Sequence, residues 1–166
     1  LVDLFLKHGP VMGVRERKDQ PGFYLFDWLE APDAFVPQYG TTTLPPKKAF
    51  FPPDETLFTF DTNTGPPPKI SLQWPKRGNF TLIGVHPCDL AAIDALDAAY
   101  TQPPGEVRWP SMRPDSIIIG IDCMPDEYCF CSSVGTLNAR GPCDMFLTRI
   151  SRGYLLEVHT SKAYPF

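Results

Sequence analysis

The sequence lacks several features that would place it in common protein classes. It has no apolar run long enough to span a bilayer and no visible secretory leader, so we expect no direct membrane insertion. The chain has no excess of positive charge: it contains 15 Lys and Arg residues and 19 Asp and Glu residues, which gives a formal net charge of −4. Nucleic-acid-binding domains are usually basic, so nucleic acid is not an expected partner.

Motifs of common enzyme families are also missing. The chain contains no nucleophile elbow, no Gly-rich phosphate loop and no dinucleotide-binding fingerprint, and we assign no catalytic residue. Histidine is scarce, and we give no role to His8 or His159. His86 stands beside a candidate ligand and could tune or ligate a metal, although capping or packing is the commoner role for such a histidine.

Cysteine is present in an odd number, five, and four of these residues fall after predicted strands. A secreted disulfide framework usually has an even number of cysteines in a smaller chain. The clustering favours a metal site, and free thiols favour a reducing compartment. We therefore expect a cytoplasmic protein, or one on the cytoplasmic face of a membrane complex.

Short apolar segments separated by Pro-rich turns predict an α/β fold in a single domain. We expect a helix ending near residue 8, a hairpin of residues 11–15 and 23–28, and short strands at 55–60 and 70–74. Buried strands follow at 80–85 and 117–121, and a C-terminal hairpin pairs residues 145–150 with 154–158. The predicted sheet is mixed, with a minor β-rich N-terminal lobe (1–75) and a second part (76–166) that bears the cysteines.

A helix is predicted directly after the strand 80–85. Leu90, Ile93, Leu96 and Tyr100 trace its apolar face, Asp94 and Asp97 lie opposite, and Asp89 is the expected cap. Cys88 then lies beside the helix N-terminus, where free N–H groups are expected to lower the pKa of a thiol.

Four cysteines are expected to meet at one edge of the sheet. If the strands 80–85 and 117–121 are parallel neighbours, Cys88 and the loop bearing Cys123, Cys129 and Cys131 emerge together. Four thiolates suit zinc or an iron–sulfur cluster, although the Cys-x2-Cys pairs of zinc ribbons and bacterial ferredoxins are absent. In an extended segment Cys129 and Cys131 would project to the same side, with Phe130 pointing away or shielding the site.

Other interpretations of these residues stay open at this point. Cys143 is expected to be an inert packing residue, because four ligands are available without it. The four thiols could hold a structural zinc, or Cys129 and Cys131 could act as a redox-active pair. Residues 47–53 are either a solvated lysine pair beside two anchoring phenylalanines or a docking surface for an acidic partner or an anionic ligand. A metal-free interaction domain that docks subunits through these residues is a further alternative.

Three motifs give the chain a family resemblance. Residues 84–90 (Gly-Val-His-Pro-Cys-Asp-Leu) resemble a Gly-Val-Arg-Pro-Cys-Asp-Leu motif, with His86 in place of Arg. Residues 118–136 resemble Ile-Gly-x-x-Cys … Cys-Phe-Cys … Gly-Thr, and residues 46–57 resemble Pro-Lys … Phe-Phe-Pro-x-x-Glu-Thr-Leu. The family is that of iron–sulfur electron-transfer subunits, found as the β subunit of cytoplasmic nickel–iron (sulf)hydrogenases and as the corresponding iron–sulfur subunit of anaerobic sulfite reductase.

This resemblance implies a subunit that passes electrons between a flavin-containing partner and a catalytic partner. It implies one [4Fe–4S] cluster on Cys88, Cys123, Cys129 and Cys131, with ligation and tuning by the protein and no bond-making of its own. Family members usually continue into a ferredoxin-like module with two four-iron clusters. These 166 residues lack it, so the chain is expected to be an N-terminal domain or a short paralogue.

Overall fold

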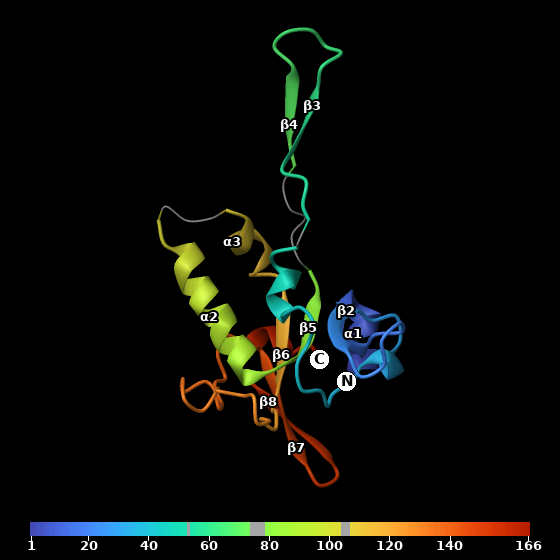
Figure 1. Ribbon diagram of the computed structural model, residues 1–166, viewed down its shortest axis with the longest axis vertical. Helices are drawn as coiled ribbons and strands as arrows, with labels where there is room; N and C mark the ends of the chain where they lie inside the picture. The colour runs from blue at the N-terminus through green and yellow to red at the C-terminus, as the bar shows by residue number, and fades with distance from the viewer. Residues whose placement is uncertain (53, 74–78, 104–106) are drawn as a thin grey trace.

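A six-stranded mixed sheet forms the centre of the protein in the computed structural model, which describes residues 1–52, 54–73, 79–103 and 107–166 (Figure 1). The strand order is β2-β1-β5-β6-β7-β8. The strands are β1 (Val11–Glu16), β2 (Tyr24–Trp28), β5 (Thr81–Val85), β6 (Ile117–Ile121), β7 (Met145–Ile150) and β8 (Gly153–Val158). The predicted α/β class with a mixed sheet and a C-terminal hairpin is confirmed.

The four inner strands run parallel, and an antiparallel strand closes each edge. β1, β5, β6 and β7 pair in parallel, whereas β2 and β8 are joined to their neighbours as hairpins. Parallel strands covered on both faces need apolar residues throughout, which explains the uninterrupted apolar sequences of β5 and β6. Strands from both predicted parts, 1–75 and 76–166, share this sheet, and the division into two parts stays a prediction.

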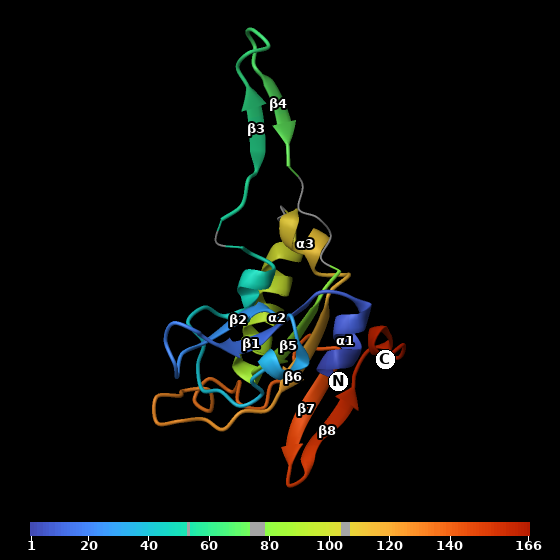
Figure 2. The ribbon, with the colours of Figure 1, turned by 90° about the vertical axis from the view of Figure 1, so that its right-hand side faces the viewer.

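Each face of the sheet has its own hydrophobic core. Successive residues of a strand point to opposite faces, so Leu82 and Ile118 belong to one core and Ile83 and Ile119 to the other. The first core lies under α2 (Pro87–Thr101), α3 (Arg108–Met112) and η2 (Pro46–Ala49), and the second lies under α1 (Val2–His8), η1 (Pro32–Ala34) and η3 (Ser161–Ala163) (Figure 2). The result is a three-layer arrangement.

Helix α2 packs by Leu90 and Ile93, as its apolar pattern predicts. One detail differs, because Asp97 does not face solvent. Its carboxylate accepts hydrogen bonds from Trp109 Nε1 at 2.6 Å and from Arg113 Nε at 3.1 Å. This carboxylate therefore ties α3 to α2, a contact that helical periodicity cannot reveal.

The strands predicted at 55–60 and 70–74 are shorter and shifted, and Trp74 lies outside the described residues. β3 (Phe58–Asp61) and β4 (Lys69–Leu72) form a separate two-stranded sheet that projects far from the body (Figures 1 and 2). Phe58 pairs with Leu72 and Phe60 with Ile70, so these four side chains share one face. All four are more than half exposed, with exposed fractions from 52% to 65%.

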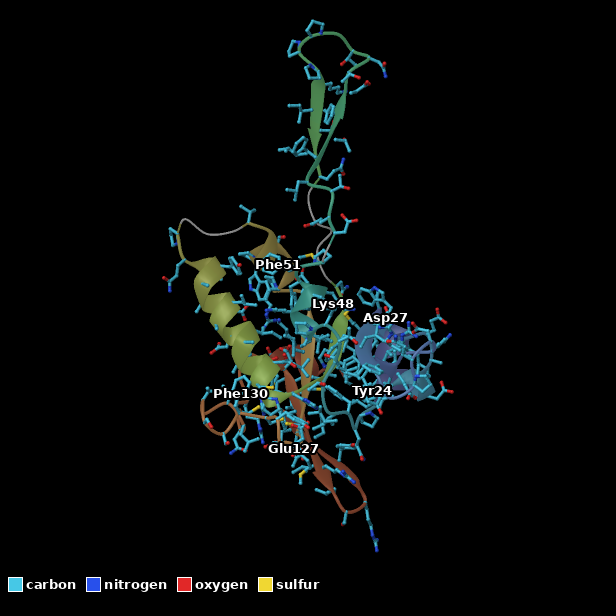
Figure 3. The ribbon with its side chains drawn as sticks, in the orientation of Figure 1. Tyr24, Asp27, Lys48, Phe51, Glu127 and Phe130 are labelled. Atoms are coloured by element: carbon cyan, nitrogen blue, oxygen red, sulfur yellow. The ribbon has the colours of Figure 1, made fainter. Side chains whose placement is uncertain are left out.

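The segment that contains η2 is held by its phenylalanines. Phe51 packs against Tyr100 and Trp109 (Figure 3). Phe50 is buried, Lys47 is exposed and Lys48 is half-buried. The interpretation of the phenylalanines as anchors beside a lysine pair is confirmed. Pro53 lies outside the described residues, and the docking role of residues 47–53 stays a prediction. In the described ranges no helix is both long and apolar enough to cross a membrane.

Candidate metal centre

The carboxyl ends of β5 and β6 meet at one edge of the sheet, as the motif spacing predicts. The two strands are parallel neighbours, with Leu82 opposite Ile118. β5 carries an irregularity between Ile83 and Val85, where Gly84 has a φ of +86°. A bulge of this kind redirects the chain at a strand end, and here it leads directly into His86 and helix α2.

Helix α2 places Cys88 in its first turn. The helix begins at Pro87, with His86 in the N-cap position, and proline is favoured at this first position because its missing N–H would have no helical partner there. The prediction of Asp89 as the cap is therefore wrong, because Asp89 lies inside the first turn. The prediction that Cys88 lies beside the helix N-terminus is confirmed.

Gly120 allows helix α2 to lie close to the sheet. A Cβ atom at this position would stand 2.6 Å from a Phe146 ring carbon and 2.9 Å from a Leu90 methyl carbon, closer than real Cβ contacts allow. The side chain of Leu90 and the ring of Phe146 occupy that space. This close approach brings the first turn of α2, and with it Cys88, to the sheet edge that also carries Cys123.

The cysteine loop after β6 is folded into turns. The Asp126 carboxylate accepts the Tyr128 N–H at 2.9 Å, and the Cys131 carbonyl accepts the Thr136 N–H at 2.8 Å. Cys129 and Cys131 therefore do not lie in an extended strand, and the geometric reason given for their convergence is wrong. Phe130 is 70% exposed, so of the two alternatives considered for it the ring points away from the loop (Figure 3).

All four candidate ligands nevertheless line one cavity of about 230 Å³. Its walls also include Tyr39, His86 and Asp89. All five cysteines of the chain are free thiols; Cys88, Cys123 and Cys131 are half-buried and Cys129 is exposed. Across the described ranges, no three His, Cys, Asp or Glu side chains stand close enough together to hold a single metal ion.

Burial and mutual repulsion dominate the acid–base chemistry of these thiols. Burial, followed by the nearby Asp89 carboxylate and the Cys131 thiol, raises the pKa of Cys88 to about 12. Burial and the Cys131 thiol likewise raise the pKa of Cys123. The expectation that the helix N-terminus lowers the pKa of Cys88 is wrong for the metal-free protein, because desolvation and like charges outweigh the dipole. Four thiolates are stable together only with cationic metal among them.

Burial shifts the pKa of two polar residues beside the thiols toward the uncharged form. Burial raises the pKa of Asp89 to about 6, although Lys47 opposes the shift, and burial lowers the pKa of His86 to about 4. The His86 ring stacks on the ring of Tyr39, with centroids 4.0 Å apart and planes 5° from parallel. The packing role considered for His86 is confirmed. Tyr39 is fixed in turn, because its hydroxyl donates to the Gly84 carbonyl at 2.6 Å.

Comparison with known proteins identifies a relative with a stated role. The chain is 36% identical, over 143 residues, to the sulfhydrogenase 2 subunit beta of Pyrococcus furiosus. The chain is related to a hydrogenase β subunit. The alignment covers 86% of the chain and 41% of the relative, so the chain spans about two fifths of the length of that β subunit. No family model matches the chain, and no solved structure matches it.

Cys143 lies apart from the cavity shared by the other four cysteines. It is buried in the first core, its thiol donates to the Arg140 carbonyl at 2.9 Å, and its sulfur lies 3.3 Å from His159 Nδ1. The prediction of a packing role for Cys143 is confirmed. In this relative of a hydrogenase β subunit, the cysteines thus separate into one buried core residue and four that face a common space.

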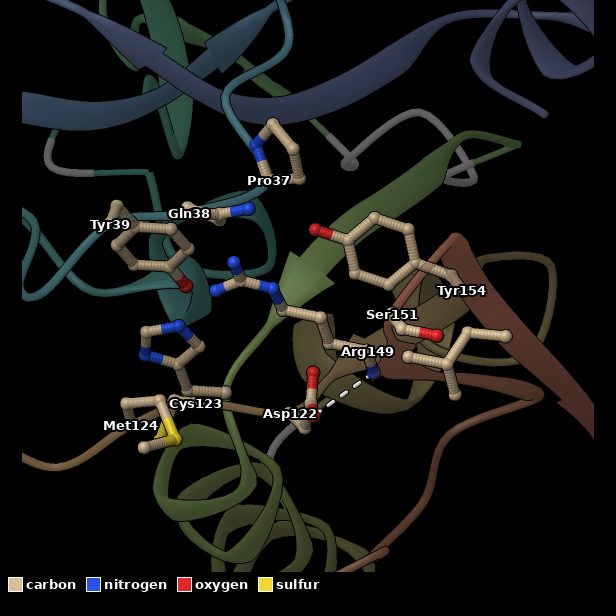
Figure 4. Close-up of a pocket in the computed structure, with 11 residues that line it drawn as sticks. Pro37, Gln38, Tyr39, Asp122, Cys123, Met124, Arg149, Ser151 and Tyr154 are labelled. Carbon is tan, nitrogen blue, oxygen red and sulfur yellow. Dashed lines mark hydrogen bonds between the residues drawn. The ribbon is translucent and has the colours of Figure 1, made fainter.

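A second cavity, of about 620 Å³, adjoins the first and was not foreseen from the sequence. The two share four lining residues: Tyr39, His86, Cys123 and Met124. Arg149 and Tyr154, from the C-terminal hairpin, complete the second cavity (Figure 4). The predicted hairpin places Arg149 and Tyr154 on adjacent strands, but neither belongs to a recognisable motif. Tyr39 lies in a segment predicted as loop, so no signal in the sequence joins it to the other two.

Proposed function

We propose that the chain is an electron-transfer domain of a hydrogenase-type redox complex and that it carries one [4Fe–4S] cluster on Cys88, Cys123, Cys129 and Cys131. The observation that carries this proposal is that these four thiols, from two segments more than thirty residues apart, line a single cavity. The similarity to a hydrogenase β subunit supports the same role and favours the hydrogenase branch over the sulfite reductase branch of the resemblance.

The residues present fit an iron–sulfur cluster better than they fit zinc. Thiolates are soft ligands, and both groups accept four of them. A zinc ion, however, binds all four sulfurs at about 2.3 Å from one point. A four-iron cubane holds its thiolates further apart because each one binds a different iron. Thiols that line one cavity without converging on one point therefore favour the cluster.

The role proposed for the chain is to hold and insulate a redox centre. When bound, the cluster supplies one-electron oxidation and reduction. Cys88 provides a ligand held by helix α2, and Cys123 provides one at the end of β6. The stacked rings of Tyr39 and His86 form one wall and exclude water from it. Burial and hydrogen bonding of this kind set the potential of a cluster.

The exposed side of the cysteine loop is the proposed approach for partner subunits. Met124, Tyr128 and Phe130 have exposed fractions of 87%, 83% and 70%, and Cys129 beside them is exposed. Contiguous patches of exposed apolar side chains mark interaction surfaces, and these three side chains come from one short stretch of the loop, residues 124–130. We propose that the partners are the flavin-containing and catalytic subunits of the complex, and that the chain performs no bond-making itself.

The metal content of protein purified without oxygen tests this assignment. We expect about four irons and four sulfides per chain and an EPR signal of a reduced cubane after dithionite, because four cysteines ligate a [4Fe–4S] cluster. Cys131→Ser should lose most of the iron and the signal, because it removes one ligand. Cys143→Ser is the matched control, since Cys143 does not line the cavity, and it should retain both.

Three results would contradict the proposal. One zinc per chain and no iron would establish the structural zinc site. No metal, even after reconstitution with iron and sulfide, would leave a docking domain or a thiol-redox role for Cys129 and Cys131. Equal iron loss in the Cys131 and Cys143 variants would mean that the loss reflects unfolding and not ligation.

A further inference from the structure

The second cavity has the size and position of a small-molecule site. Its volume of about 620 Å³ lies within the range of ligand pockets, about 300–1,000 Å³. It lies beyond the carboxyl ends of β5 and β6, the edge at which open α/β sheets bind ligands. It is therefore a candidate site on grounds of shape and topology, before its chemistry is considered.

An unpaired cation lines this cavity. Figure 4 shows the guanidinium group of Arg149 extending into it. None of the acidic residues in the described ranges forms an ion pair with Arg149. Asp122 lines the same cavity, but its carboxylate accepts the backbone N–H of Arg149 at 3.0 Å. The side-chain fork of Arg149 thus keeps its donors available, in a geometry that matches phosphate and carboxylate groups.

A second donor at the cavity has no partner. The Tyr154 hydroxyl is buried, and among the described residues it makes no hydrogen bond. Figure 4 shows this hydroxyl on the side of the tyrosine ring that faces the cavity. A buried hydroxyl without a partner is costly, and native structures rarely keep one without a functional reason. Arg149 and Tyr154 come from the two strands of one hairpin, which sets their relative positions.

We propose that this cavity binds the oxyanion group of a small molecule, a phosphate or a carboxylate, between Arg149 and Tyr154. The remaining wall is mixed. Tyr39, Pro37 and Met124 give it an aromatic and apolar part that suits the body of the ligand. Gln38, Asp122 and Ser151 give it a polar part. Because the two cavities share Cys123 and His86, the ligand lies beside Cys123, one of the four thiols. The assignment stands on the chemistry of this cavity and does not require the thiols to hold a cluster.

Titration of the purified protein with two probes tests the proposal. Inorganic phosphate, followed by calorimetry, represents the free anion, and flavin mononucleotide, followed by its fluorescence, represents a phosphate joined to a flat ring. We expect saturable binding of one ligand per chain. Arg149→Gln should weaken it by at least about tenfold, through loss of a charge-assisted contact, and Tyr154→Phe by about fivefold, through loss of one hydrogen bond.

Arg152→Gln is the matched control. Arg152 lies in the turn of the same hairpin and does not line the cavity, and its replacement removes an equal charge. It should change affinity by less than about twofold, because Arg152 does not line the cavity and the effect of a distant charge is screened. Tighter binding of flavin mononucleotide than of phosphate would identify the ligand as a phosphate ester of a ring compound. Equal binding of the two would identify a free oxyanion.

Two results would overturn the proposal: no saturable binding of either probe, or equal weakening by the Arg149 and Arg152 substitutions. Iron content measured on the same samples separates this proposal from the cluster assignment. Arg149→Gln should retain its iron while losing the anion. Cys131→Ser should lose iron while keeping phosphate binding, because Cys131 does not line the second cavity.

Discussion

The two pairs of strands β5–β6 and β3–β4 both carry large apolar residues, but they lie in opposite environments. β5 is buried along its whole length, whereas every residue of β3 and β4 is exposed. In β5 and β6 apolar residues point to both faces of the sheet, and each face is covered by helices. In β3–β4 the apolar residues share one face and the polar residues the other. Apolar content alone therefore does not indicate burial, and the distribution of that content over the two faces does.

The contrast also appears in the energetics that we expect. An isolated two-stranded hairpin is marginally stable in water because it buries too little apolar surface. The central strands are stabilised from both sides, which makes them a rigid base for Cys88 and Cys123. Substitutions in the two regions should therefore differ strongly in their effect on stability.

The largest effect is expected for Phe146→Ala in β7. Phe146 is fully buried, and its ring packs against Gly120 and under the Arg140 guanidinium group, 3.7 Å from the ring centroid. The loss of buried surface and the resulting cavity should lower the free energy of unfolding by about 3–5 kcal/mol. Chemical denaturation followed by circular dichroism measures this change. A loss below about 1 kcal/mol would show that the core under α2 is loosely packed.

A smaller effect is expected for Asp144→Ala, which tests the buried side-chain hydrogen bonds beside the same strands. The buried Asp144 carboxylate accepts the Ile118 N–H at 2.9 Å and the Thr160 hydroxyl. Removal of the carboxylate leaves a backbone donor of β6 without its partner, which should cost about 1–3 kcal/mol in the same assay. Thr160→Val removes only the hydroxyl and should cost less. A Thr160 variant as damaging as the Asp144 variant would contradict this assignment of the loss to the Ile118 N–H.

The smallest effect is expected for Phe60→Ser on the β3–β4 hairpin. Phe60 is 63% exposed, so its replacement should change the free energy of unfolding by less than about 0.5 kcal/mol. Ile119→Ser in β6, a fully buried apolar position, serves as the opposite extreme and should destabilise strongly. A destabilisation of several kcal/mol by Phe60→Ser would mean that the hairpin packs against the body in solution.

The sequence allowed the prediction of those parts of the fold that depend on local patterns. The strand–helix–strand unit that carries Cys88 and Cys123 follows from two apolar runs and one amphipathic segment, and it was predicted correctly. The predicted cap of α2, Asp89, lies three residues after the observed N-cap, His86, because proline at the first helical position competes with aspartate as a start signal. The strands of the projecting β3–β4 hairpin were predicted, but a local pattern cannot show that their apolar face stays exposed.

The site was predictable only where its residues belong to motifs. The four cysteines were named in advance because their residue type narrows the possible chemistry. The turns that bring Cys129 and Cys131 to the cavity depend on individual hydrogen bonds, such as that between Tyr128 N–H and Asp126, which a spacing argument cannot supply. Arg149 and Tyr154 pair across the predicted C-terminal hairpin, but Tyr39 meets them only through tertiary structure, and no motif marks any of the three.

The hydrogen bond from Tyr39 to the Gly84 carbonyl has a mechanical consequence for both cavities. Tyr39 lines both cavities. Its ring stacks on His86, and its hydroxyl is hydrogen-bonded to the backbone of β5. Because β5 is buried along its whole length, we expect this hydrogen bond to hold Tyr39 in place more firmly than its own loop would. An occupant of one cavity and an occupant of the other would then be kept apart by the same fixed pair of rings.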